Sequence, residues 1–369
     1  MQIDDPWRFA RPELADHFMQ LLLDAPRRPL AVFGPRQTGK TYFLTHDLAE
    51  AAAAKGVRPI YVDLWTQTDA LGTINTALAM VLRLLTSAAG RTAVTGVGAV
   101  GVNVALAAPA ALMPTSDPSA WMSLQFAELR RLEPKRPILL MLDEAQTLGK
   151  GVAGDAAMKA VRGLFNTHPG GLLLLLTGSS KPQLLALVGD HSKTAFKLAA
   201  HMDFPTLGIG FVGFVGKRHK ASTGRVVPVV ELDWAFSRLQ HRPGELIDFV
   251  RFWIADQPTM ALAAALDAFK AKTRPDAAFE QQYAECTPLQ RLLLEGVARG
   301  NQLFSAVTRQ QIAASLGMEG VIAPSTLAGA AKTLESRGIL TKAGRGKYQL
   351  EDEQFGRWLG LRRDDENQT

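Results

Sequence analysis

The eight-residue segment GPRQTGKT at positions 34–41 constrains what this chain can fold into more than any other part of the sequence. It matches the pattern G-x-x-x-x-G-K-[ST] in full, and it lies between an apolar run at 29–33 and a helix-like stretch that continues to about Lys55. Glycines allow the backbone to wrap so that consecutive N–H groups point at one anion, and the N-terminus of the following helix adds its dipole. A chance match in a turn would lack this strand–loop–helix context. We therefore predict a loop that cradles phosphate groups.

Two residues of this loop have specific chemistry to offer. We predict that the Lys40 ammonium contacts the β- and γ-phosphates of a nucleotide and that the Thr41 hydroxyl is a ligand of Mg²⁺. The candidate nucleotide ligands all lie in the loop or directly after it: Gly34, Pro35, Arg36, Gln37, Thr38, Gly39, Lys40, Thr41 and Tyr42.

A second candidate feature is the end of the apolar run at 137–142, which is followed by Asp143 and Glu144. We predict that Asp143 holds Mg²⁺ through its water shell and that Glu144 polarises an attacking water. That pair would make the site hydrolytic rather than only nucleotide-binding. The alternative, a solvated strand terminus, is the weaker explanation because a phosphate loop lies upstream.

A third polar strand end follows the apolar run at 171–176. Thr177, Ser179 and Ser180 stand where a hydroxyl can hydrogen-bond the γ-phosphate or the attacking water, and among them we favour Ser179. The same residues could instead be turn residues that cap the next helix. The predicted catalytic residues are therefore Glu144, Lys40 and Ser179.

Apolar runs alternate with helical stretches through the first half of the chain, which predicts a parallel α/β sheet. We expect strands at 29–33, 58–64, 137–142 and 171–176, and helices at 12–25 and 71–87. Strands this apolar imply a sheet covered on both faces. After residue 198 we expect a hairpin of segments 211–215 and 225–232 across a basic tip, a helical region at 234–272 and a linker at 272–282.

The G-P-R-x-x-G-K-T loop, the L-D-E-A-Q strand end and the T-G-S-S strand end together resemble the archaeal-type ATPase group. That group belongs to the AAA+/STAND division of the additional-strand P-loop NTPases. Arg11-Pro12-Glu13-Leu14 is similar to the R-x-x-E-L entry that places the first helix near the adenine in those families, with an Arg-to-Glu spacing one residue shorter. The resemblance covers about residues 8–250. It implies an AAA+-like core with a helical lid, ATP and Mg²⁺ as cofactors, and ATP hydrolysis.

Two features depart from this family pattern. AAA+ ATPases usually supply an arginine finger from a neighbouring subunit shortly after the sensor strand, and here the candidates are Lys181, Lys193 and Lys197. Lysine lacks the planar fork that grips phosphate in two places, so activation in a ring is not implied. Arg242 lies where these families place a lid or second sensor. It either reaches the γ-phosphate or is a solvated arginine at a helix start.

Residues 287–360 resemble a winged helix. Thr287, Thr308 and Ser325 are each expected to cap a helix, and two short strands should follow around Gly344 and Gly346. Winged helices commonly place a recognition helix in the major groove of DNA. By resemblance, the wing would lie on the DNA backbone.

Charge in this region supports a DNA contact. Between Lys332 and Lys347 there are five positive residues against Glu335 alone, and such a cluster suits phosphate contacts. The predicted DNA-binding residues are Ser325, Thr326, Lys332, Lys342, Arg345 and Lys347. The basic tip at 217–225 is a second candidate contact. The alternative is a winged helix that serves as a lid or docks a protein, and the acidic tail after residue 363 cancels part of the charge.

Composition limits the remaining classes. The net charge of +6 permits an anionic partner, and a single cysteine excludes a disulfide-stapled secreted fold. The N-terminus carries acids and no apolar signal region, so we expect a cytoplasmic protein. Residues 92–116 carry no charge, but their glycines, alanines and prolines favour an inserted hairpin or packed loop over a membrane helix.

These observations divide the chain into a P-loop ATPase core at 1–205, a basic hairpin with a helical lid at 206–275, and a winged-helix domain at 276–369. The leading hypothesis is a nucleotide-dependent ATPase switch that acts on double-stranded DNA through the winged helix. The alternative is a STAND-like signalling or defence switch whose winged helix docks a protein. Assembly with itself or with a partner protein is compatible with either.

Overall fold

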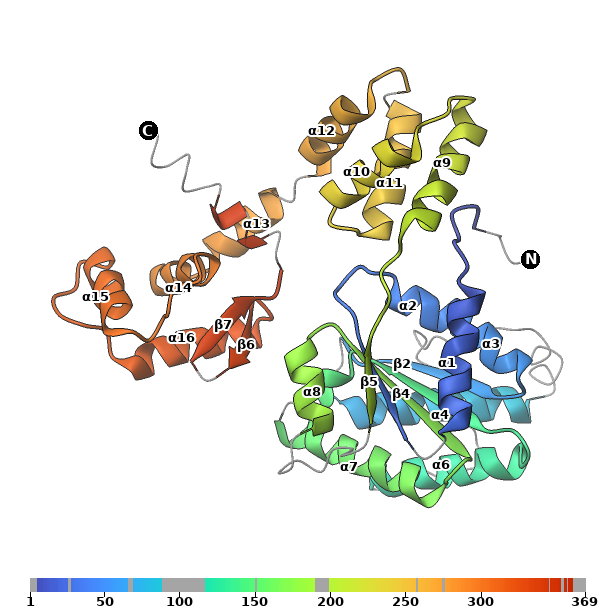
Figure 1. The fold of residues 1–369 in the computed structure, drawn as a ribbon. Helices are drawn as coiled ribbons and strands as arrows, with labels where there is room; N and C mark the ends of the chain where they lie inside the picture. Colours follow the sequence, from blue (N-terminus) through green and yellow to red (C-terminus); the bar gives the residue numbers. More distant parts are fainter. Residues whose placement is uncertain are drawn as a thin grey trace. The chain divides into compact units, whose positions relative to one another are not determined.

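The computed structural model describes residues 5–25, 28–65, 69–87, 117–149, 151–189, 199–256, 258–273, 276–344, 346–352, 355–356 and 358–360. These residues form two compact units, Met1–Leu266 and Asp267–Thr369 (Figure 1). The predicted loop at 92–116, Lys193, Lys197 and Arg345 lie outside the described residues. Within the described ranges, none of the helices is long and apolar enough to cross a bilayer.

The first unit is built on a five-stranded parallel sheet. Its strands are β1 (Leu30–Phe33), β2 (Arg58–Asp63), β3 (Ile138–Asp143), β4 (Leu172–Gly178) and β5 (Ala200–Asp203), in the spatial order β2-β3-β4-β1-β5. The four strands predicted from apolar runs are confirmed. The fifth was not predicted because β5 reads Ala-His-Met-Asp and alternates half-buried with exposed residues, so it has no apolar run. Strand β4 lies between β1 and β3, which brings the three polar strand ends to one edge.

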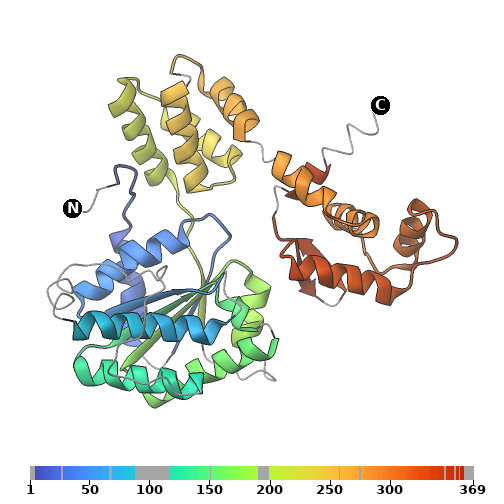
Figure 2. The same cartoon turned by 180° about the vertical axis from the view of Figure 1, so that it is seen from behind.

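Helices cover both faces of the sheet, as the apolar strands predict. One face packs against α4 (Ala70–Thr86), α6 (Pro118–Leu132), α7 (Gly151–Thr167) and α8 (Lys181–Gly189), and α4 and α6 are neighbours in the view of Figure 2. The other face packs against α1 (Pro12–Asp24) and one continuous helix made of α2 (Lys40–Tyr42), η1 (Phe43–Leu48) and α3 (Ala49–Ala54).

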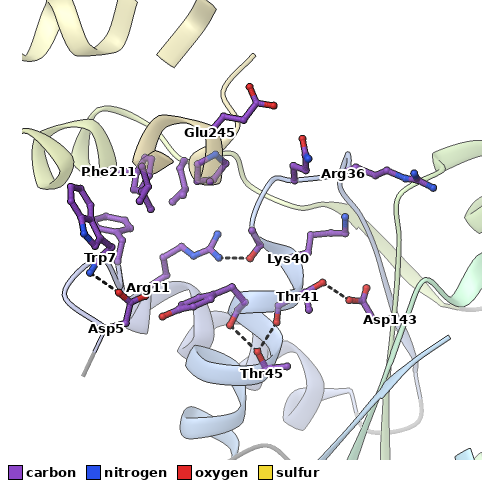
Figure 3. A pocket seen from close by; sticks show the side chains of 18 of the residues that line it. Asp5, Trp7, Arg11, Arg36, Lys40, Thr41, Thr45, Asp143, Phe211 and Glu245 are labelled. Carbon is purple, nitrogen blue, oxygen red and sulfur yellow. Dashed lines mark hydrogen bonds between the residues drawn. The ribbon is translucent and has the colours of Figure 1, made fainter. Parts of the chain in front are cut away.

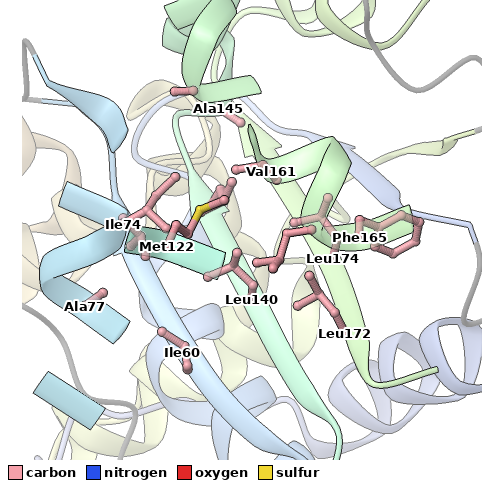
Figure 4. Packing of buried hydrophobic residues seen from close by; sticks show 14 of the residues in the cluster. Ile60, Ile74, Ala77, Met122, Leu140, Ala145, Val161, Phe165, Leu172 and Leu174 are labelled. Carbon is pink, nitrogen blue, oxygen red and sulfur yellow. The ribbon is translucent and has the colours of Figure 1, made fainter. Parts of the chain in front are cut away.

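Side chains of each strand alternate between these two cores. Leu140 and Leu142 of β3 join the first core, drawn in Figure 4, whereas Leu139 and Met141 join the second. Full burial of one such side chain contributes about 1.5–3 kcal/mol. A register slip of one residue would exchange the side chains that face the two cores. Burial on both faces therefore fixes the strand register, and with it the positions of the polar strand ends.

The expected hairpin at 211–232 is wrong. The structure has a helical subdomain of α9 (Ile209–Thr223), α10 (Val229–Arg238) and α11 (Pro243–Asp256), and α12 (Leu262–Thr273) follows it across the boundary between the two units. Phe211, Val215 and His219 are spaced four residues apart and are all buried, which is the period of a helix and not of a strand. The basic tip is the last turns of α9, and Gly224, with φ of +73°, ends that helix.

The C-terminal unit shows the predicted succession of three helices and a hairpin. These elements are α14 (Pro288–Ala298), α15 (Ala306–Ser315), α16 (Pro324–Ser336), β6 (Leu340–Gly344) and β7 (Lys347–Leu350), with β6 and β7 antiparallel. Helix α13 (Asp276–Ala284) lies in the segment expected to be a linker, where Phe279 packs into the core of this unit.

Of the three predicted caps in this unit, one is correct. Thr287 forms a complete capping box with Gln290. Thr308 is not a cap. Its backbone N–H donates to Ser305 Oγ at 3.1 Å, so Ser305 is the cap and the helix starts three residues earlier than predicted. Ser325 is not a cap either, because Pro324 occupies the first helical turn and shifts the cap position to Ala323.

Candidate functional site

The loop between β1 and α2 is held by one hydrogen bond to β4 and by one within the loop. Gly34 N donates to Gly178 O of β4 at 3.1 Å, and Thr38 Oγ1 donates to Pro35 O at 2.8 Å. Gln37 and Gly39 have φ values of +61° and +83°. Such a conformation suits glycine but is strained at Gln37, and strain of this kind concentrates at ligand-binding loops.

Lys40 lies across this loop. Its Nζ donates to Gly34 O and, at 3.0 Å, to Pro35 O, and the residue is only 5% exposed. Burial lowers the pKa of the Lys40 ammonium, while the nearby Glu144 and Asp143 carboxylates oppose that shift. A bound phosphate oxygen would exchange with the two carbonyls as partner of Nζ.

Asp143 is the centre of a buried network at the carboxyl end of β3. Its Oδ2 accepts from Thr41 Oγ1 at 2.7 Å and from Tyr61 Oη at 3.1 Å. Its Oδ1 accepts from Thr177 Oγ1 and from Glu144 N at 3.1 Å. Burial, followed by the Asp143 charge, raises the pKa of the Tyr61 phenol, so Tyr61 stays a donor. Four donors hold the carboxylate at the foot of the loop.

Glu144 is held beside this network by two polar side chains. Ser179 Oγ donates to Glu144 Oε2 at 2.6 Å, and Gln146 Nε2 donates to the same oxygen at 2.5 Å. Glu144 has a φ of +56°, a strained conformation for a residue with a side chain. This strain turns the residue after β3 so that Glu144 lines the cavity described below.

The three hydroxyls at the carboxyl end of β4 have different partners. Ser179, the favoured sensor, contacts Glu144, whereas Thr177 contacts Asp143. Ser180 Oγ is buried and has no hydrogen bond among the described residues, while its carbonyl accepts the N–H of Leu184 at 2.9 Å in the first turn of α8. Gly178 allows Gln146 to approach, because an added Cβ would lie 2.4 Å from Gln146 Oε1.

A cavity of about 850 Å³ extends from this polar centre toward the helical subdomain. This volume suits a nucleotide-sized ligand. In Figure 3, Lys40, Thr41 and Asp143 lie at one end, and Trp7 and Phe211 lie at the other. The cavity is therefore polar where phosphates would lie and aromatic where a base would lie.

The apolar end is formed by residues from three parts of the chain: Trp7 and Phe9 of the N-terminal segment, Leu207 just before α9 with Phe211 in its first turn, and Pro243 and Ile247 of α11. At the other end, Arg36 stacks over Trp65 with its guanidinium carbon 3.9 Å from the ring centroid.

Of the predicted site residues, Arg36, Gln37, Gly39, Lys40, Thr41, Tyr42, Asp143 and Glu144 line the cavity. Arg242 instead pairs with Glu245 at 2.9 Å, and the following residues of α11 reach the cavity. Lys181, a candidate finger, pairs with Asp203 of its own chain at 2.6 Å.

Several side chains at the site were not predicted. Tyr61 contacts Asp143 because β2 lies beside β3, an order of strands that a single sequence does not show, whereas Gln146 contacts Glu144 from the turn directly after β3. Trp7 and Phe211 gave no sequence signal, because isolated aromatic residues are ordinary core residues.

The donor set at the loop is compatible with Mg²⁺. The Thr41 hydroxyl and the Asp143 carboxylate adjoin each other and supply the hard oxygen ligands that this ion prefers. Among the residues that the structure describes, no group of three or more His, Cys, Asp or Glu side chains forms a separate metal site. A magnesium ion here would therefore complete its coordination with substrate oxygens and water.

No protein-family model matches the sequence, and no curated protein matches it. Solved structures do match. The Walker-type ATPase of Pyrococcus abyssi is 17% identical over 95% of this chain and 96% of its own, with a TM-score of 0.60. The ORC2 protein of Aeropyrum pernix, in ADPNP–ADP complexes, is 13% identical over 98% of this chain and 99% of its own, with a TM-score of 0.55.

The fold is that of the AAA+ P-loop ATPases. The ADP form of the same ORC2 protein gives 12% identity, 97% coverage of both chains and a TM-score of 0.54. The fold implied by the sequence motifs is thus confirmed. At these identities the likeness concerns the fold, and the argument for activity depends on the site.

Proposed function

We propose that the unit Met1–Leu266 binds ATP with Mg²⁺ and hydrolyses it. One observation carries this proposal: the Thr41 hydroxyl and the Asp143 carboxylate, 102 residues apart, are hydrogen-bonded beside Lys40 and Glu144 at the polar end of one cavity. The Aeropyrum pernix ORC2 structures with ADP and ADPNP support a nucleotide as the ligand.

Each group has a role that follows from its position. The N–H groups of the loop and the Lys40 ammonium bind the β- and γ-phosphates. Thr41 and Asp143 hold Mg²⁺, which supplies charge stabilisation to the phosphates when bound. Glu144 takes a proton from the attacking water. Ser179 and Gln146 both donate to Oε2, so Oε1 is the oxygen that would accept this proton.

Calorimetric titration with Mg–ADPNP tests the binding step. Lys40→Ala should weaken binding at least about 100-fold, because it removes a charged contact to phosphate. Lys55→Ala is the matched control, since Lys55 lies at the end of the same helix and pairs with Asp16 on the surface. Equal affinities of the wild type and Lys40→Ala would overturn the assignment of the loop.

We further propose that the C-terminal unit is a winged helix that binds double-stranded DNA. Its support is a set of exposed side chains: Ser325 and Thr326 at the start of α16, Lys332 farther along it, and Lys342 and Lys347 on the two strands. Arg337, in contrast, pairs with Glu285 at 3.0 Å and is less available for phosphate. Phosphate contacts from α16 and the hairpin would position the unit on a duplex.

Electrophoretic mobility shift across a salt series, with and without ATP, tests this proposal. Changing Lys332, Lys342 and Lys347 together to Ala should weaken binding and reduce the salt slope by about 3, because each lost contact to B-DNA removes about 0.9. Changing the half-buried Lys270 and the exposed Lys272 of α12 to Ala is the control. Absence of binding at low salt would favour the alternative, a STAND-like switch whose C-terminal unit docks a protein.

We also propose that nucleotide state controls assembly, with a second copy or a partner protein. Because Lys181 pairs with Asp203 of its own chain, the proposed assembly does not use this lysine as a finger. Molecular mass measured with ADPNP, with and without duplex DNA, tests it. The same mass under all conditions would contradict it.

A further inference from the structure

The N-terminal segment is attached to the phosphate-loop helix at one buried carboxylate, Asp47. The residue is 5% exposed. Its Oδ2 accepts the backbone N–H of Arg11 at 3.2 Å and lies 3.7 Å from Arg11 Nε. Its Oδ1 lies 3.5 Å from Arg8 Nη2, which also pairs with Glu50 at 2.7 Å. Asp47 thus contacts both arginines of the segment, and it shares Arg8 with Glu50 of the same helix.

Local helix geometry explains how an acid comes to be buried here. Asp47 belongs to η1, a π-helical stretch six residues long inside the helix that follows the loop. Its neighbours Phe43, Leu44 and Leu48 are buried in the core of the sheet. π-Helical turns are costly and occur frequently at functional sites. In this one the buried Asp47 faces the N-terminal segment.

Arg11 carries the connection from Asp47 into the cavity. Its Nη2 donates to Gly39 O of the phosphate loop at 2.9 Å. Its guanidinium carbon lies 5.0 Å from the ring centroid of Phe43 and 4.9 Å from that of Phe204. The side chain is 10% exposed, and its buried Nη1 has no hydrogen bond among the residues that the structure describes. Burial lowers the pKa of this guanidinium, but Asp47 opposes that shift.

The same segment forms part of the apolar end of the cavity. Trp7 and Phe9 line it on either side of Arg8 in the sequence, and Phe9 contacts Phe211 with ring centroids 5.6 Å apart. Asp47 itself is not one of the described residues that line the cavity. Its effect on a ligand must therefore pass through Arg8 and Arg11.

We propose that Asp47 is a positioning residue that couples the two ends of the nucleotide site. By holding Arg8 it fixes Trp7 and Phe9 at the base end, and by orienting Arg11 it fixes the Gly39 carbonyl at the phosphate end. The Nη1 donor of Arg11 is thereby held between the two ends, where it binds the ribose–phosphate part of the nucleotide. This inference depends on the proposed nucleotide binding and adds a residue to it.

Two ligands separate positioning from general support of the fold. Mg–ADPNP contacts both ends of the cavity, whereas Mg–tripolyphosphate has no base or ribose. We expect Asp47→Asn to weaken ADPNP binding by about 10- to 100-fold, the range for loss of a charge-assisted contact. Tripolyphosphate affinity should fall by a clearly smaller factor than ADPNP affinity, because tripolyphosphate meets only the phosphate end of the site. An equal loss for both ligands, or no loss for ADPNP, would overturn the proposal.

A double-mutant cycle tests whether Asp47 acts through Arg11. Because part of the coupling passes through the Arg11 side chain and the rest through Arg8, Asp47→Asn should weaken ADPNP affinity by a smaller factor in an Arg11→Met background than in the wild type. Additive losses would show an independent action and contradict the proposal. If Asp47→Asn does not fold, Arg11→Lys replaces it, since lysine keeps the charge but lacks the planar fork. It should also lose ADPNP selectively.

Two controls complete the experiment. Asp16→Asn removes another acid that pairs across to the same helix, with Lys55 at 2.9 Å, and should leave both affinities unchanged. A wild type that binds no ADPNP would refute the proposed function itself. A wild type that binds ADPNP and loses it with Lys40→Ala, but not with Asp47→Asn, would refute only the role of Asp47.

Discussion

Replacement of Thr177 by Val tests the network around Asp143. Thr177 is 2% exposed at the end of β4, and its hydroxyl donates to Asp143 Oδ1 in a site that is equally buried. Valine has the same shape, so the change leaves no cavity and suits a strand. It removes one of four donors from a buried carboxylate and leaves Thr41, Tyr61 and the Glu144 N–H in place.

The expected cost follows from the kind of hydrogen bond. A bond to a charged group contributes about 1.5–3 kcal/mol, so we expect the free energy of unfolding of the unit Met1–Leu266 to fall by about 2 kcal/mol. For a unit of this size that corresponds to a melting temperature lower by roughly 4–8 °C. Tyr61→Phe removes another donor from the same carboxylate and should act in the same direction.

Urea denaturation followed by tryptophan fluorescence measures this change in the first unit. Five of the six tryptophans lie in Met1–Leu266, namely Trp7, Trp65, Trp121, Trp234 and Trp253. Thr86→Val is the control, because the Thr86 hydroxyl is exposed and bonds only to its own helix. An unchanged midpoint for Thr177→Val at unchanged slope would refute the claim that this hydroxyl supports the carboxylate.

Three further predictions concern other parts of the structure. Gly178→Ala should displace Gln146 from Glu144, because the added Cβ would lie 2.4 Å from Gln146 Oε1. We expect ATP hydrolysis to be at least about tenfold slower at unchanged ADP affinity. An unchanged rate would contradict a role of the Gln146–Glu144 hydrogen bond in hydrolysis. Burial lowers the pKa of His219, so the unfolded chain takes up a proton at a higher pH than the folded protein does. The urea midpoint of the first unit should therefore fall as the pH drops below about 6.5, and it should fall less in His219→Phe. Identical pH profiles of the two proteins would show that His219 does not cause the pH dependence. Ser305→Ala should lower the free energy of unfolding of the C-terminal unit by about 1 kcal/mol, measured in thermal melts. A larger loss of stability in Thr308→Ala than in Ser305→Ala would contradict Ser305 as the cap.

The parts of the site that depend on contiguous sequence could be predicted. The loop at 34–41 and the acidic end of β3 have residue types fixed by phosphate and metal chemistry, and apolar runs place their strands. Which strand lies beside which is set by packing over long sequence separations. The contacts of Thr177 with Asp143 and of Ser179 with Glu144 could therefore be expected as neighbours but not assigned.

The sequence-based prediction of secondary structure was wrong where the same apolar residues fit both the two-residue period of a strand and the 3.6-residue period of a helix. In the segment after Gly208, buried Phe211, Val212 and Val215 fit a short strand as well as a helix. Asp47 could not be recognised at all. An acid in the middle of a helix is usually solvated, and only the π-helical turn and two arginines 36 and 39 residues upstream explain its burial.

The central claim is that Glu144 activates water for ATP hydrolysis in this cavity. The most direct measurement is phosphate release from Mg–ATP in a single turnover, compared between wild type and Glu144→Gln. The amide can keep accepting from Ser179 and Gln146 through its oxygen, so ADPNP affinity should change by less than about 3-fold while the rate falls at least about 100-fold. Equal rates of phosphate release in the two proteins would contradict the account.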